Sequence, residues 1–212
     1  MAFFNNRDQY GWMSLFLHWL LFVLLAGMLA GGKYSASLAP DDKIGLIIDL
    51  HKQVGMAVFV LMAFRLLWRL INRSLDSTGN ILMRFTAFLV HWLMYIVVLV
   101  QAAIGVTMSQ MAGHDVLFFN TFEVPSLVEF GKGFLTQMSF FVELITNAQK
   151  TGAQMYALHA FFGNALLALI GLHIAGALFH HIFMGDDILR RIFFGYKPSY
   201  AEKSAAESKI RR

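Results

Sequence analysis

The sequence predicts an all-α integral membrane protein built as a bundle of four transmembrane helices. Of its 212 residues, 58% are hydrophobic and only 14% are charged, which is too apolar for a soluble domain of this size. Four apolar stretches are each long enough to cross about 30 Å of hydrocarbon. They cover roughly residues 14–32, 51–71, 85–108 and 157–183. With three prolines and no Ser/Pro-rich linker, we expect one domain over residues 1–196 and a polar tail over residues 197–212.

The first apolar stretch is interpreted as an uncleaved span and not as a signal peptide. The residues before it carry no clear positive cluster, and the segment GGKYSASLAP after it is only weakly similar to a cleavage site.

Basic residues orient the predicted helices, because Lys and Arg gather on the cytoplasmic side of membrane proteins. If the N-terminus is cytoplasmic, only five of the 17 lysines and arginines lie outside. These five are Lys33, Lys43, Lys52, Lys132 and Lys150. The sequence therefore predicts that both termini, and the tail, are cytoplasmic. The net charge of +4 is then explained by membrane topology. Because the sequence has no basic-aromatic patch of the kind that binds nucleic acid, we expect the lipid bilayer as a partner and no nucleic acid.

The connection between the third and fourth spans, residues 109–156, is long for a passive link. Within it, LVEFGKGFLTQMSFFVELI places apolar side chains at helical spacing. These are Phe130, Phe134, Met138, Phe141 and Ile145. We expect a short amphipathic helix on the outer membrane face. A fifth span is the alternative, but it would break the charge pattern.

Two histidines of the fourth span, His159 and His173, are the most informative pair. Ionisable side chains inside a membrane are candidates for functional sites. Fourteen residues separate these two, so both imidazoles leave the helix on one face, about 21 Å apart along its axis. By depth, His51 matches His159 in the outer leaflet and His18 matches His173 in the inner leaflet. The pattern predicts two stacked flat cofactors, each between two imidazoles.

Haem iron fits each predicted pair best. Two neutral imidazoles in opposite axial positions suit haem and leave no open site. Zinc or copper takes three or four ligands at one depth, with carboxylate or thiolate among them. The chain has no cysteine, and the first, third and fourth apolar stretches contain no Asp or Glu. The lack of cysteine also excludes disulfides, iron–sulfur clusters and covalently attached c-type haem. Simple interhelical hydrogen bonding is the structural alternative.

Residues around the histidines extend this interpretation. Gly55 and Gly163 each follow a histidine by four positions, where a bare backbone lets a broad ring approach. Arg65 follows His51 by fourteen residues, so we expect its guanidinium at the inner level, where it can pair with a haem propionate. Lys52 is a second candidate for a propionate, with snorkelling to the membrane surface as the alternative.

Four segments occur in order along the chain: FLHWLLF, DLHKQVG, HWLMY and ALHAFFGNALLALIGLHIAGALFHHIFMGDDILRRIF. Together they resemble the bacterial four-helix cytochrome b561 family of di-haem b membrane proteins, and the resemblance covers most of residues 10–195. The resemblance implies that His18, His51, His159 and His173 are the axial iron ligands, the same four that depth selects. It also implies a multi-pass protein of the bacterial inner membrane that transfers electrons between a periplasmic donor and the quinone pool, with ubiquinone as acceptor or donor.

Three further histidines need assignment. His91, in HWLMY, competes with His18 as the partner of His173. We favour His18 because it begins the HW motif of the first span, and we expect His91 to bond a helix or a quinone. His180 lies seven residues beyond His173 on the same side of the helix, where it can serve a quinone head group or remain an interfacial imidazole. His181 points away and is expected at the lipid surface.

The outer electron donor is left open between alternatives. Some relatives resemble superoxide oxidases that reduce ubiquinone, so superoxide is one candidate for a quinone-linked oxidoreductase. The outer side carries more acids than lysines, which does not steer an anion, although Lys52 beside His51 is a local positive point. A haem b membrane-anchor subunit, serving a separate dehydrogenase or hydrogenase-type partner, is the alternative function. A cation carrier is a further alternative, but no buried carboxylate accompanies the histidines.

Overall fold

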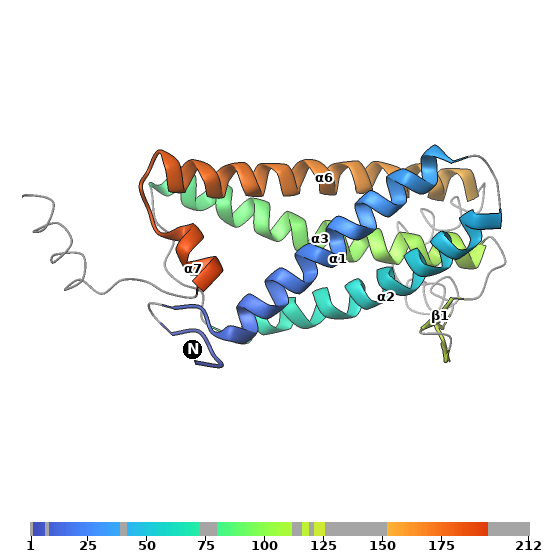
Figure 1. Ribbon diagram of the computed structural model, residues 1–212, viewed down its shortest axis with the longest axis horizontal. Coiled ribbons are helices and arrows are strands. Elements are labelled where there is room, and N and C mark those ends of the chain that lie inside the picture. The colour runs from blue at the N-terminus through green and yellow to red at the C-terminus, as the bar shows by residue number, and fades with distance from the viewer. Residues whose placement is uncertain are drawn as a thin grey trace, which may run out of the picture.

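The computed structural model is a bundle of long helices (Figure 1). It describes residues 2–6, 9–38, 42–72, 80–111, 116–118, 121–125 and 152–194. The long helices are α1 (Trp12–Ser37), α2 (Asp42–Ile71), α3 (Ile81–Met111) and α6 (Gly152–Ile182). Within the described ranges, these four are long and apolar enough to cross a membrane. The predicted four-helix membrane bundle is therefore confirmed.

The helices are longer than the apolar stretches that predicted them. α1 continues from residue 32 to Ser37, and α2 begins at Asp42 instead of near residue 51. Apolar content marks only the part of a helix that lies in hydrocarbon. Backbone hydrogen bonding continues the helix into the headgroup region, where polar side chains are tolerated.

Helices adjacent in sequence run antiparallel and pack side by side, α1 against α2, α2 against α3 and α3 against α6. α1 and α6 face each other across a wider separation. The central contacts come from one apolar cluster that draws on all four helices. Its buried members are Leu21, Leu25, Val58, Met62, Tyr95, Val97, Val98 and Leu166.

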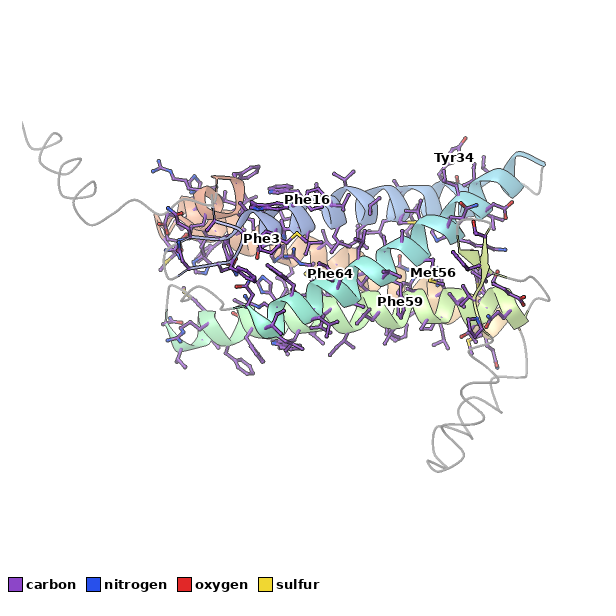
Figure 2. The ribbon with its side chains drawn as sticks, turned by 90° about the horizontal axis from the view of Figure 1, so that it is seen from below. Phe3, Phe16, Tyr34, Met56, Phe59 and Phe64 are labelled. Atoms are coloured by element: carbon purple, nitrogen blue, oxygen red, sulfur yellow. The ribbon has the colours of Figure 1, made fainter. Side chains whose placement is uncertain are left out.

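Many large apolar side chains lie on the outside of the bundle. Figure 2 labels Phe16, Tyr34 and Phe64 among those on α1 and α2, and all three are exposed. A surface this apolar is unfavourable in water but suits lipid, since helices satisfy their own backbone hydrogen bonds in hydrocarbon. The surface therefore agrees with the membrane-spanning assignment.

The two ends of the bundle carry different elements. The N-terminal segment and α7 (Ile188–Phe194) lie at one end, and the small hairpin of β1 (Leu117–Phe118) and β2 (Phe122–Glu123) lies at the other (Figure 1). The strands pair antiparallel, with Leu117 opposite Glu123. Which end faces the cytoplasm stays a prediction. The predicted amphipathic helix within residues 127–145 and the polar tail over residues 197–212 lie outside the described residues.

Side-chain hydrogen bonds hold α7 against α1. The Trp19 indole N–H donates to the Ile192 carbonyl at 3.0 Å, and the Trp19 ring lies 4.7 Å from that of Phe193. Within the short helix, Arg191 is buried and pairs with Asp187 at 2.7 Å. These contacts turn the chain back across the end of the bundle.

The N-terminal segment is fixed at the same end through Asn5. Its side-chain oxygen accepts hydrogen bonds from the Gly11 amide and the Ser14 hydroxyl, both at 2.8 Å. The Trp68 indole in turn donates to the Ser14 hydroxyl at 3.0 Å. The start of α1 is thereby joined to the end of α2.

Candidate functional site

Each long helix carries two residues, fourteen positions apart, at which it meets the other helices. These residues form two levels along the bundle. Four residues that contact one another form the level named here the His51 level: Gly32, His51, Gly105 and His159. Four others form the His18 level: His18, Arg65, His91 and His173. The repeat places one residue of every helix at each level, about 21 Å apart along the axis.

An apolar layer lies midway between the two levels. It consists of Leu25, Val58, Val98 and Leu166, each seven residues from both levels on its own helix. All four side chains are buried in the same cluster. The layer closes the interior between the levels with tight packing of hydrocarbon, which keeps water out.

His51 and His159 face each other at the His51 level. Their ring centroids are 6.2 Å apart and the ring planes meet at 72°. Two glycines lie beside them: a Cβ added at Gly32 would sit 3.4 Å from His51 Cε1, and one added at Gly105 would sit 3.1 Å from His159 Cε1. The contact at Gly105 is tighter than most real Cβ contacts, so a larger residue there would press on the His159 ring, whereas the contact at Gly32 is an ordinary one.

Gly55 and Gly163, which the sequence predicts beside a broad cofactor ring, are not the glycines that contact these imidazoles. A Cβ at Gly55 would meet the Met28 methyl group at 3.2 Å, and one at Gly163 would meet the Gln101 amide nitrogen at 3.4 Å. Both glycines therefore lie against neighbouring side chains, and their place beside a cofactor ring stays a prediction. The fourteen-residue step from His18 to Gly32 is the sequence signal that was missed.

Gln101 of α3 is a further polar side chain near the His51 level. Its amide nitrogen donates to the His159 carbonyl at 2.9 Å. Among the described residues, no group bonds Nδ1 of His159 or the side-chain oxygen of Gln101, although both atoms are buried. A buried unpaired nitrogen is costly, and the ring of His159 therefore has one nitrogen that the described residues leave without a partner. A polar amide within the apolar third span is the sequence feature that identifies Gln101 as a candidate.

His18 and His173 face each other at the His18 level. Their ring centroids are also 6.2 Å apart, with the planes at 56°. Arg65 donates from Nη2 to Nδ1 of His18 at 3.1 Å and from Nη1 to the Ser14 carbonyl at 3.2 Å. The guanidinium thus lies at the level at which the sequence predicted it.

His91 is a third imidazole at the His18 level. Its ring centroid is 4.9 Å from that of His173, in an edge-to-face arrangement at 87°, nearer than His18 is. Nδ1 of His91 lies 2.5 Å from the Ala87 carbonyl one turn earlier. The bond to a helix carbonyl is one of the two roles expected for His91. The structure brings both His18 and His91 to His173.

The remaining candidates lie toward the ends of the bundle. Lys52 is half-buried beside His51. At the opposite end, Nδ1 of His180 bonds a carboxylate oxygen of Asp186 at 2.6 Å, across the turn that leads to α7. Across the wider α1–α6 separation, Lys33 donates to the Asn164 side chain at 2.6 Å. That pair was not anticipated, because lysine near a span end reads as a snorkelling residue.

The two histidine pairs have the donor chemistry and spacing that haem iron requires. A metal–imidazole bond of about 2 Å on each side of a metal puts two opposed ring centres about 6 Å apart, and both observed separations are 6.2 Å. In the part of the chain that the structure describes, no compact cluster of three His, Asp or Glu side chains forms a metal cage. The opposed pair of imidazoles at each level therefore fits haem better than zinc or copper, which take three or four ligands at one depth.

Comparison with known proteins agrees with this site. The prokaryotic cytochrome b561 family model matches residues 9–195. The chain is 26% identical to cytochrome b561 homolog 2 of Escherichia coli K12 over 195 residues, covering 91% of this chain and 95% of that protein. It is 24% identical to cytochrome b561 homolog 1 of the same organism over 188 residues, covering 87% and 97% of the two chains.

The matched family consists of multi-pass bacterial membrane proteins that bind haem b and transfer electrons across the membrane. The four apolar helices described above meet that description. Because the family model matches almost the whole chain, this protein belongs to the prokaryotic cytochrome b561 family.

Proposed function

We propose that this protein transfers electrons across the bacterial inner membrane through two bis-histidine haem b groups, between a periplasmic donor and the quinone pool. His18 and His173 would hold one group, and His51 and His159 the other. The observation that carries this proposal is the equal 6.2 Å separation within both pairs, repeated at two levels along α6. Bound haem iron supplies the one-electron chemistry that amino-acid side chains lack.

The protein's own residues prepare each site. The two opposed imidazoles of each level would hold the group from both sides, which would leave no position for an exogenous ligand. Gly32 and Gly105 leave the space beside the rings of the His51 level. The Leu25, Val58, Val98 and Leu166 layer excludes water from the interior between the levels.

Arg65 serves the anionic edge of the cofactor in this proposal. An arginine only donates hydrogen bonds, so its bond to His18 leaves Nδ1 of that ring as acceptor. Iron ligation through Nε2 requires the proton on Nδ1 instead, and Arg65 must then bond elsewhere. A propionate carboxylate is the partner that a guanidinium prefers.

The quinone is assigned to the end of the bundle that carries His180. Because Asp186 bonds Nδ1 of His180 at 2.6 Å, Nε2 is left for the head group of a quinone. The surrounding turn lies where α6 leaves the apolar region, the depth at which a quinone ring meets the headgroups. The excess of basic residues supports the cytoplasm as the side of this end.

The donor belongs to the opposite, periplasmic end. Superoxide is the candidate that the family resemblance provides, and Lys33 and Lys52 are the cations nearest the His51 level in sequence. Lys33 follows Gly32 directly, and Lys52 follows His51. Their local positive charge attracts a small anion even where the outer loops are acidic overall.

Spectroscopy with haem quantification tests the proposal. The purified protein should give a b-type reduced-minus-oxidised spectrum with two haems per chain. His51→Ala or His159→Ala should remove one haem, and His18→Ala or His173→Ala the other, while His181→Ala serves as a matched control that retains both. A colourless protein would contradict the proposal.

The anchor-subunit alternative shares the haem sites and differs in the substrate. A dihaem protein that copurifies with a soluble oxidoreductase, and that is inactive alone with quinone analogues, would favour that alternative. Turnover of a quinone analogue by the isolated chain would support the function proposed here.

A further inference from the structure

The third helix contributes different residues to the two levels. At the His51 level α3 carries Gly105, whose backbone lies against the His159 ring. Fourteen residues earlier, at the His18 level, α3 carries His91, whose ring contacts His173 at 4.9 Å. His159 and His173, the two predicted haem ligands of α6, therefore have different neighbours on α3.

The hydrogen bond of His91 determines which of its nitrogens is free. The Ala87 carbonyl can only accept, so Nδ1 of His91, 2.5 Å away, must carry the proton. Neutral imidazole has one proton, and Nε2 is consequently an acceptor. An acceptor nitrogen on a ring in contact with His173 is able to take a hydrogen bond from that residue.

An iron-bound imidazole has one N–H left, and its partner tunes the metal. An acceptor on this N–H makes the ligand more basic, which favours oxidised iron and lowers the reduction potential. His91 offers such an acceptor to His173. At the other level, no described residue bonds Nδ1 of His159, and Gly105 has no side chain to offer.

We propose that His91 is a positioning residue that accepts a hydrogen bond from His173 and lowers the potential of the haem at the His18 level relative to its partner. The inference rests on the proposed function, because it requires His173 to be an axial ligand. It gives one side chain of α3 a part in the difference between the two sites.

Redox titration of the purified dihaem protein tests this role. His91→Phe keeps a ring but removes the acceptor, and it should raise the potential of one haem. The expected change is about tenfold in the one-electron equilibrium constant, or about 59 mV. His91→Gln retains an acceptor oxygen and should shift the potential less. Trp92→Phe, at the next position of α3, is the matched control and should leave both potentials unchanged.

Three outcomes would overturn the inference. Unchanged potentials in His91→Phe, with both haems retained, would remove the tuning role. Loss of one haem from His91→Phe would make His91 an axial ligand instead. An equal shift of both potentials would show a general effect on the bundle. Failure of the proposed function is distinguishable, because the unsubstituted protein would then lack the two haems.

Discussion

Arg65 of α2 donates a hydrogen bond to Nδ1 of His18 in α1 at 3.1 Å, across 47 residues of sequence. The same guanidinium donates to the Ser14 carbonyl, one turn before His18 on α1. A permanent cation is thereby held against a predicted iron ligand within the membrane. Such a charge is expensive in hydrocarbon and is retained where it has a partner.

Removing this cation should lower the potential of the haem at the His18 level. A nearby positive charge favours the reduced, more negative form of the cofactor. For Arg65→Leu we expect the equilibrium constant for one-electron reduction of this haem to fall roughly tenfold, which is the size expected for the loss of a charge-assisted hydrogen bond. Redox titration measures it. Arg65→Lys keeps the positive charge and should leave the potential close to that of the unsubstituted protein. An unchanged potential in Arg65→Leu would refute the assignment.

Enlarging Gly105 should empty one haem site selectively. A Cβ at this position lies 3.1 Å from His159 Cε1, and the branched Val side chain must push the ring aside. Gly105→Val is therefore expected to lower the haem content from two toward one per chain, as measured by haem extraction. Gly171→Val on α6 is the control, because a Cβ there meets nothing within 4 Å. Full haem content in Gly105→Val would count against a cofactor at the His51 level.

His180 should affect quinone turnover without affecting the haems. His180→Phe removes the imidazole that Asp186 orients, and we expect the rate with a quinone analogue to fall roughly tenfold or more. The haem spectrum should stay unchanged, since His180 lies two turns beyond His173. His181→Phe is the neighbouring control. Equal rates for the two variants and the unsubstituted protein would place the quinone elsewhere.

Trp19 should contribute to stability by holding α7. In Trp19→Phe the Ile192 carbonyl loses its 3.0 Å donor, at a cost of about 1 kcal/mol. Thermal unfolding in detergent should show the loss, and trypsin should cleave faster after the exposed Arg190. Trp12→Phe, at the exposed start of α1, is the control. Unchanged cleavage would mean that other contacts are sufficient to hold α7.

Much of the site can be predicted from the periodicity of each helix taken alone. The fourteen-residue step from His159 to His173 fixes their common face, because helical periodicity repeats after nearly four turns. The same step relates His51 to Arg65, and the structure does bring Arg65 to the His18 level. The role of each residue as a ligand remains a prediction that the haem measurements test.

Contacts between side chains of different helices are harder to predict from the sequence. The HW motif of the first span favours His18 over His91 as the partner of His173. The structure brings both rings close, with His91 the nearer. The glycines beside the rings likewise proved to be Gly32 and Gly105, which lie on other helices than the rings they contact.

The sequence by itself determined the membrane class, the four spans, the family and the histidines, because hydropathy and periodicity are properties of one segment at a time. Only the tertiary structure decided which side chains meet across the bundle, since the rotation and offset of each helix arise from packing against its neighbours. The approach of Gly105 to His159, the contact of His91 with His173 and the docking of Trp19 on Ile192 all depend on that packing.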